Sequence, residues 1–182
     1  MPELICVSGG PTKPEIIAVS LSKVGAEDGD VFADVGCGTG SVSIELNRSV
    51  RNLSFVAMDA RKEAVDATTA NFRSFGVENA RIFFGESSEV IRGLDKIDCA
   101  FVGGTKNICA VLDALIEKGA RSIVVNAVRI ETVVRTMDHM KKAGIYKETV
   151  LLNVARSADL TGETYFRPEN PVYVICGRRD QK

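Results

Sequence analysis

Three glycines at alternating positions are the strongest chemical signal in the sequence. They lie in the segment from Asp34 to Gly40 (DVGCGTG), directly after an apolar run that predicts a buried strand. Glycine has no Cβ, so the backbone can bend sharply and approach a bound molecule closely. The residues after Gly40 predict a helix, whose free N–H groups can receive an anionic group. We therefore expect this segment to bind a ligand through its backbone.

An acidic residue follows the glycine segment at a distance that suits a nucleoside. Asp59 lies 19 residues after Gly40, at the end of the next predicted strand. A carboxylate in this place can accept hydrogen bonds from both hydroxyl groups of a ribose. A solvated turn or a cap for the next helix would explain Asp59 taken alone. The glycine segment at this distance favours the ribose role.

The spacing of the glycines separates two classes of cofactor. Gly36, Gly38 and Gly40 form G-x-G-x-G, whereas dinucleotide enzymes usually show G-x-G-x-x-G. The first pattern is typical of methyltransferases, in which this turn holds the methionine part of S-adenosyl-L-methionine. Asp34 either orients the turn, contacts the amino group of the cofactor or binds backbone N–H groups. Glu86, after the third predicted strand, is expected near the adenine unless it only begins a short helix.

The elements that must position these residues alternate between β-rich runs and helical patterns. A helix is predicted at Pro14–Val24, where Thr12 and Glu15 have the spacing of a capping box. Five βα units follow, and this alternation predicts a parallel sheet. The predicted strands are 31–35, 53–58, 81–84, 97–102 and 122–126, and the predicted helices are 41–48, 62–75, a short one ending at 94, one from 108 to 119 and one from 130.

The C-terminal part of the chain departs from this alternation. Thr149–Val154 and Val172–Ile175 are predicted strands, and residues 156–169 between them show no helical periodicity. Two strands joined without a helix cannot form a parallel crossover, so they should pair antiparallel. The sequence therefore predicts the class I S-adenosylmethionine methyltransferase fold, an α/β fold. Its seven-stranded, mostly parallel Rossmann-like sheet would end in an antiparallel hairpin, in a single domain over residues 1–182.

Composition and charge narrow the classes of function. The chain is 45% hydrophobic and 26% charged, as in soluble globular proteins, and no apolar run reaches the roughly 20 residues of a membrane span. The stretch from Met1 to Gly10 lacks the features of a signal peptide. A net charge of −1 argues against a nucleic-acid partner. Five cysteines without a C-x-x-C pair and one histidine, His139, argue against a metal site and favour reduced thiols in the cytoplasm.

Two segments taken together resemble one particular family. Gly9–Ile16 (GGPTKPEI) and Asp34–Glu45 (DVGCGTGSVSIE) are similar to the decarboxylating cobalt-precorrin methyltransferases of cobalamin biosynthesis. Residues 102–104, 124–128 and 170–173 extend the resemblance over nearly the whole chain. The chain departs from the pattern at Lys106, because relatives have small residues after the paired glycines.

The resemblance implies a reaction and a set of binding residues. Members of this family methylate carbon 15 of a cobalt-precorrin tetrapyrrole and remove the carboxyl group of the ring C acetate, and free-standing members form homo-oligomers, so we expect a homotetramer. Lys13 is the favoured cation for the substrate carboxylates, although Thr12 and Lys13 could simply begin a helix. Lys106, Arg129, Arg156 and Arg167 are further candidate cations. The predicted cofactor-binding residues are Thr12, Asp34, Gly36, Cys37, Gly38, Thr39, Gly40, Asp59 and Glu86, and the predicted substrate-binding residues are Lys13, Gly103 and Gly104.

Methyl transfer is an in-line displacement that depends mainly on alignment, and the sequence identifies no catalytic acid or base. Two alternatives remain open. An RNA, DNA or protein methyltransferase of the same fold usually carries a D/N-P-P-Y motif after the fourth strand, where this chain has Val102-Gly103-Gly104. A nucleotide-binding dehydrogenase or a non-catalytic module is opposed by the glycine spacing and the terminal hairpin.

Overall fold

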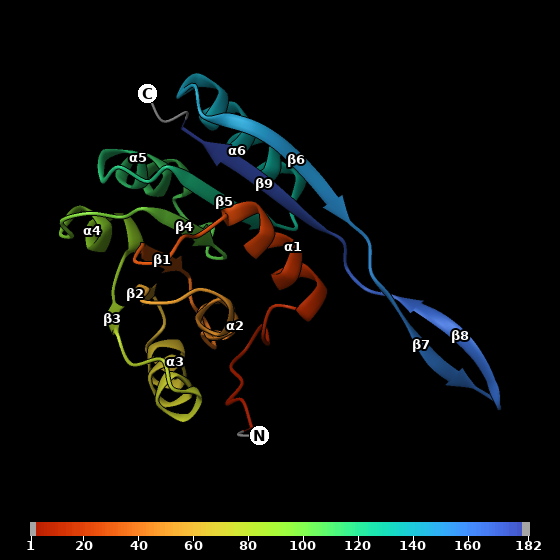
Figure 1. The fold of residues 1–182 in the computed structure, drawn as a ribbon. Coiled ribbons are helices and arrows are strands. Elements are labelled where there is room, and N and C mark those ends of the chain that lie inside the picture. Colours follow the sequence, from red (N-terminus) through yellow and green to blue (C-terminus); the bar gives the residue numbers. More distant parts are fainter. Residues whose placement is uncertain (1–2, 180–182) are drawn as a thin grey trace.

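A seven-stranded sheet forms the centre of the computed structural model, which describes residues 3–179 (Figure 1). Met1 and Pro2, which belong to the stretch interpreted above as lacking a signal peptide, lie outside the described residues. The strand order is β3-β2-β1-β4-β5-β9-β6, with β1 to β5 parallel and β9 antiparallel to both of its neighbours. The predicted class I methyltransferase fold is confirmed. The strands of this sheet are β1 Val31–Val35, β2 Ser54–Asp59, β3 Ala80–Phe84, β4 Cys99–Val102, β5 Ser122–Ala127, β6 Tyr146–Leu152 and β9 Val172–Arg178.

Helices cover both faces of this sheet. Successive residues of β1 enter different apolar clusters: Phe32 packs on the side of α1, α2 and α3, and Ala33 packs on the side of α4, α5 and α6. A strand that is buried on both faces needs a continuous apolar run, which is why residues 31–35 could be predicted as a strand. The helices are α1 Pro14–Val24, α2 Ser41–Ser49, α3 Lys62–Phe75, α4 Ser87–Arg92, α5 Ile108–Glu117 and α6 Ile130–Lys142. Within residues 3–179, no helix has the length and apolar character needed to cross a bilayer.

The predicted capping box at the start of α1 is wrong. Lys13, not Thr12, occupies the N-cap position, and no side chain caps this helix. Pro14 at the first helical position has no N–H group, so fewer donors need a partner there. The carboxylate of Glu15 instead binds Arg156, at 2.7 and 3.0 Å.

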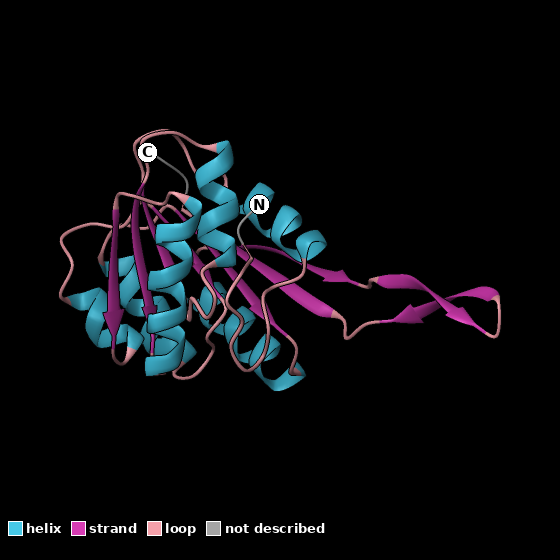
Figure 2. Ribbon diagram, turned by 90° about the horizontal axis from the view of Figure 1, so that it is seen from below, coloured by secondary structure: helices cyan, strands magenta, loops and turns pink. Residues whose placement is uncertain are grey.

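A long two-stranded arm projects from the sheet between β6 and β9 (Figure 2). It consists of β7, Ala155–Leu160, and β8, Glu163–Pro168, paired antiparallel. The sequence pattern predicted no strands in this region. Thr161 and Gly162 both have positive φ angles, of 54° and 87°, as a two-residue hairpin turn of type I′ requires. The residues of the arm are mostly exposed, so the hydrophobic pattern of a buried strand is absent there.

Candidate active site

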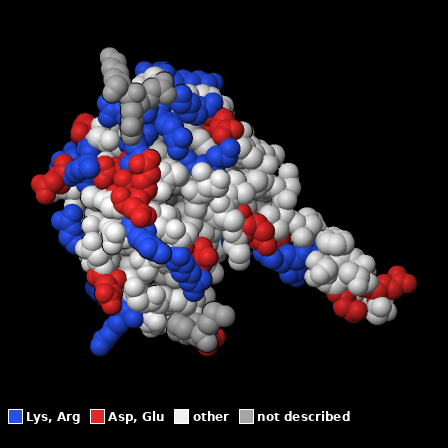
Figure 3. Space-filling view, in the orientation of Figure 1, with Lys and Arg blue, Asp and Glu red and all other residues white. Residues whose placement is uncertain are grey.

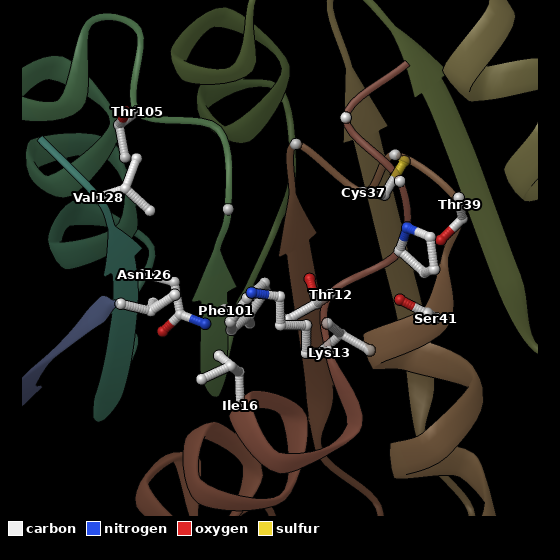
Figure 4. A pocket seen from close by; sticks show the side chains of 18 of the residues that line it. Thr12, Lys13, Ile16, Cys37, Thr39, Ser41, Phe101, Thr105, Asn126 and Val128 are labelled. Carbon is white, nitrogen blue, oxygen red and sulfur yellow. The ribbon is translucent and has the colours of Figure 1, made fainter. Parts of the chain in front are cut away.

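A cleft of about 600 Å³ opens at the carboxyl ends of β1, β4 and β5 (Figure 4). Parallel α/β sheets bind their ligands at this edge. The residues that follow the three strands supply the floor, and the segment before α1 supplies one wall. Of the predicted cofactor- and substrate-binding residues, the cleft is lined by Thr12, Lys13, Asp34, Gly36, Cys37, Gly38, Thr39 and Gly103.

The glycine turn is shaped by two different demands. Gly36 has a φ of 75°, and a Cβ there would lie 2.4 Å from the backbone nitrogen of Gly104, so the two loops meet through glycines. Gly38 has a φ of 58°, but a Cβ there would meet nothing nearer than 3.9 Å. The first glycine is therefore required for packing inside the protein, whereas the second keeps the surface of the cleft open.

Two side chains of α3 hold the turn from behind, and sequence reasoning missed both. The Thr68 hydroxyl donates to the Gly38 carbonyl at 3.0 Å, and the Asn71 amide donates to the Thr39 carbonyl at 2.9 Å. Both side chains lie on the buried face of the helix. Burial raises the pKa of Cys37 to about 12, so this residue lines the cleft as a neutral thiol.

Asp34 carries a buried carboxylate with one unused oxygen. Its Oδ2 accepts a hydrogen bond from the Ser43 hydroxyl at 2.6 Å, whereas its Oδ1 is buried and has no partner within the described residues. Burial raises the pKa of Asp34 to about 6, against the lowering effect of Ser43. An unpaired buried acceptor costs about 1–3 kcal/mol. Because Asp34 lines the cleft, a cationic donor on a ligand would satisfy this oxygen.

Asp59 lies at the end of β2 and reaches the glycine turn. Its Oδ2 accepts a hydrogen bond from the Gly38 N–H at 3.1 Å, and only 6% of its side chain is exposed. The guanidinium of Arg61 covers the carboxylate, with Nε at 3.1 Å from Oδ1 and Nη2 at 3.1 Å from Oδ2. This bonding raises the pKa of Arg61. Arg61 lines the cleft, although no motif in the sequence marked it as a site residue.

Lys13 lines the cleft but already has a partner. Its ammonium lies 2.5 Å from Glu169, which also accepts from Arg156 at 2.8 Å. Arg156 in turn pairs with Glu15, so α1 is tied to the base of the arm. Of the other candidate cations, Arg129 lines the cleft, Lys106 is exposed and Arg167 lies on β8. The structure therefore brings Lys13 and Arg129 to the cleft and leaves Arg167 on the arm.

Besides Asp59, which stands behind Arg61, three predicted residues lie outside the cleft lining. Gly40 is the N-cap of α2, and Gly104 packs against Gly36. Glu86 is the N-cap of α4, where its carboxylate accepts from the Glu89 N–H at 3.0 Å and from the Ser88 hydroxyl at 2.6 Å. Glu86 therefore begins a short helix, as one of the two interpretations of the sequence expected. Contact between Glu86 and adenine stays a prediction.

The strand order, the glycine turn after β1 and the acid at the end of β2 together define a class I methyltransferase. The family model of the precorrin methyltransferase domain matches residues 6–178, and the chain belongs to this family. The resemblance inferred from Gly9–Ile16 and Asp34–Glu45 is thereby confirmed.

Relatives and solved structures agree with this assignment. A protein of Methanosarcina acetivorans named probable cobalt-precorrin-6B C(15)-methyltransferase (decarboxylating) is 66% identical over 98% of this chain and 99% of its own length. A protein of the same name from Methanosarcina mazei is 63% identical with the same coverage. The crystal structure of a precorrin 8W decarboxylase from Methanobacterium thermoautotrophicum is 30% identical and has a TM-score of 0.88, with 96% of each chain covered.

Proposed function

We propose that this methyltransferase transfers a methyl group from S-adenosyl-L-methionine to carbon 15 of a cobalt-precorrin and removes the carboxyl group of the ring C acetate. The 66% identity to a relative named for this reaction, over nearly the full length of both chains, is the observation that carries the proposal. The cleft at the ends of β1, β4 and β5 is the site at which we place the reaction.

The residues present fit the cofactor. The unpaired Oδ1 of Asp34 suits the ammonium of the methionine part, and the open surface at Gly38 admits the chain that follows it. Asp59 lies next to Gly38 and is the acceptor for the ribose hydroxyls. S-adenosyl-L-methionine would supply the electrophilic methyl group, while the protein binds and aligns the reactants.

The substrate must occupy the other side of the cleft. Figure 4 shows Thr105 and Val128 across the pocket from Cys37 and Thr39. A volume of about 600 Å³ is that of a site for one ligand of ordinary size, so the macrocycle would extend past the rim formed by Thr105 and the exposed Val128. Arg129 follows Val128 in the lining of the cleft, and we expect its guanidinium to pair with substrate carboxylates.

Turnover of a cobalt-precorrin pool with a methyl-labelled cofactor tests the proposal. We expect a product that has gained one labelled methyl group and lost carbon dioxide, as read by mass spectrometry. The electron pair of the broken carbon–carbon bond passes into the macrocycle, where it balances the positive charge that comes with the transferred methyl group, so the overall reaction takes up no net proton. Labelling of RNA or protein instead, with the tetrapyrrole unchanged, would contradict the proposed substrate.

Lys13→Ala is expected to raise the KM for the tetrapyrrole while the affinity for S-adenosylhomocysteine stays nearly constant. The ammonium stands in the cleft wall, and a substrate carboxylate could replace Glu169 as its partner. Steady-state kinetics measure the KM, with Lys23→Ala as the control. Lys23 also pairs with a glutamate, Glu148, but it does not line the cleft, so its loss should leave the KM unchanged. An unchanged KM in Lys13→Ala would mean that Lys13 only holds Glu169.

We further propose that the arm joins copies of the chain into a homotetramer. A hairpin of two strands is marginally stable in water by itself. Three large apolar side chains on the arm are exposed. Figure 3 shows acidic side chains near the tip of the arm, whereas its middle is largely uncharged. A second arm of the same kind is the partner that would cover this surface. The exposed residues are Leu160, Tyr165 and Phe166, with exposed fractions of 59%, 39% and 70%.

Phe166→Ser is expected to lower the molar mass in solution towards that of the single chain, because the most exposed of these apolar side chains is lost. Light scattering coupled to size-exclusion chromatography measures this mass. Glu163→Gln, at the polar end of the same strand, serves as the control and should keep the mass of the wild type. Equal molar masses for Phe166→Ser and the wild type would mean that the arm does not join copies of the chain.

We also propose that residues 1–182 form one domain and that the protein works in the cytoplasm. The five cysteines are free thiols, as is usual in a reducing compartment.

A further inference from the structure

The carboxylate of Asp59 has no free acceptor position. Its Oδ1 accepts from the backbone N–H of Arg61 at 3.0 Å and from Nε of the same residue at 3.1 Å. Its Oδ2 accepts from the Gly38 N–H and from Nη2 of Arg61, both at 3.1 Å. An ionised carboxylate offers about four lone-pair sites, and four donors occupy them here. A ribose can therefore bind to Asp59 only when a donor leaves.

We propose that Arg61 is a latch, which the ribose of the cofactor displaces from Asp59, and that this exchange frees the middle of the chain segment Ser8–Lys13 at the cleft. We call this segment the strap. The inference rests on the proposed function, because that proposal assigns the ribose to Asp59. It makes Arg61 a positioning residue, which sets the affinity for the cofactor and the order in which cofactor and substrate bind.

Arg61 is the donor that can leave. Its side chain is 41% exposed, whereas that of Asp59 is 6% exposed, so the guanidinium stands on the solvent side of the carboxylate. The Gly38 and Arg61 N–H groups belong to the backbone and stay in place. An ion pair open to water contributes little free energy, since water replaces most of the attraction. Two ribose hydroxyls can therefore compete with the two side-chain bonds of Arg61.

The same guanidinium also holds the strap. Its Nη1 donates to the Ser8 carbonyl at 3.0 Å and lies 3.4 Å from the Ser8 hydroxyl. Within residues 3–179, the bonds from Arg61 are the ones that connect residues 8–11 to a distant part of the protein. The other hydrogen bond of these residues is local, from the Gly10 N–H to the Val7 carbonyl. Residues 8–11 are exposed, and a Cβ at Gly9 or Gly10 would meet no atom within 4 Å, so packing does not hold these residues either.

The strap is anchored firmly at its two ends. Before it, the Ile5 N–H donates to Oδ1 of Asn71 and the Ile5 carbonyl accepts from Nδ2 of the same side chain, both at 2.9 Å. At its end, Lys13 pairs with Glu169. Loss of the Arg61 tie would thus free only the middle of the segment, which forms the wall of the cleft with Thr12 and Lys13. Cofactor binding would in this way unlock the wall for the tetrapyrrole, so the cofactor binds first.

Calorimetric titration with S-adenosylhomocysteine tests the latch. We expect Arg61→Ala to bind about fivefold more tightly than the wild type, the ratio that corresponds to one exposed ion pair that no longer has to be broken. Arg61→Lys should lie between them, because an ammonium cannot cover both carboxylate oxygens. Lys62→Ala removes the adjacent exposed pair with Asp66 and should match the wild type. Equal or weaker binding by Arg61→Ala would overturn the latch, and weaker binding would mean that Arg61 itself contacts the cofactor.

Hydrogen exchange of the strap gives the second readout. In the wild type, saturation with S-adenosylhomocysteine should speed the exchange of the Gly10 amide, the one amide of the strap that donates a hydrogen bond among the described residues, to the Val7 carbonyl at 2.9 Å. In Arg61→Ala the exchange of this amide should already be fast without ligand. An unchanged rate in the wild type would overturn the release of the strap. If the wild type does not bind S-adenosylhomocysteine at all, the proposed function fails. Binding with no difference between the variants overturns the latch alone.

Discussion

Gly38→Val is expected to abolish binding of S-adenosylhomocysteine in calorimetric titrations while the protein still folds. A Cβ at this position would meet nothing nearer than the Arg61 side chain at 3.9 Å, so the first atom of the added side chain has room in the protein. It projects instead from the surface of the cleft, where the backbone has to approach the ligand. The positive φ of 58° adds a strain of about 1–2 kcal/mol, which a domain of ordinary stability survives.

Gly76→Val provides the matched control for this prediction. Gly76 also has a positive φ, of 72°, and a Cβ there would meet no atom within 4 Å, but this glycine ends α3 away from the cleft. The two variants should lose similar amounts of stability in thermal unfolding, and only Gly38→Val should lose the ligand. Wild-type affinity in Gly38→Val would remove the glycine turn from the binding site.

The glycine turn and Asp59 could be predicted because their signals are local. A continuous apolar run gives β1, the next residues show the G-x-G-x-G spacing, and Asp59 ends the following strand. Each of these features depends on residues that are close in the sequence. The class of fold followed from the same kind of information, since alternating strand and helix patterns leave few topologies open.

The contacts of the site could not be predicted because they join distant parts of the chain. Arg61 binds Ser8, which lies 53 residues earlier, and Lys13 binds Glu169 at the other end of the protein. Thr68 and Asn71 are polar residues on the buried face of α3, and no sequence pattern indicates that they hold the glycine turn. The arm lacks a buried face, so its strands carry no hydrophobic alternation.

Asp34→Asn is expected to stabilise the protein increasingly as the pH rises. Burial raises the pKa of Asp34 from 3.8 to about 6, so the folded protein disfavours the ionised form. An acid with a raised pKa contributes to the free energy of unfolding through its protonated form. This contribution is fully present below about pH 4 and is lost as the pH rises through about 6. The shift corresponds to roughly 3 kcal/mol at neutral pH. The asparagine variant does not ionise and therefore avoids this loss.

Urea unfolding at about pH 3.5 and about pH 7 measures the effect of the substitution on the free energy of unfolding, and the two values are then compared. The free energy of unfolding of Asp34→Asn minus that of the wild type should be larger at neutral pH by about 3 kcal/mol, and any cost of the new amide cancels because it is present at both pH values. Asp66→Asn, with a carboxylate that is 62% exposed, is the control and should show little such change. A difference that does not depend on pH would mean that Asp34 titrates normally.

The same substitution should weaken binding of S-adenosylhomocysteine, by about 1–3 kcal/mol. The unpaired Oδ1 of Asp34 is destabilising in the free protein, and a cationic group of the ligand would recover that free energy on binding. A neutral amide offers no charge to such a group. Asp34→Asn would then be more stable and bind less well, which is the pattern of a residue retained for its ligand and not for the fold. Greater stability with unchanged affinity would show that the unpaired oxygen does not face the cofactor.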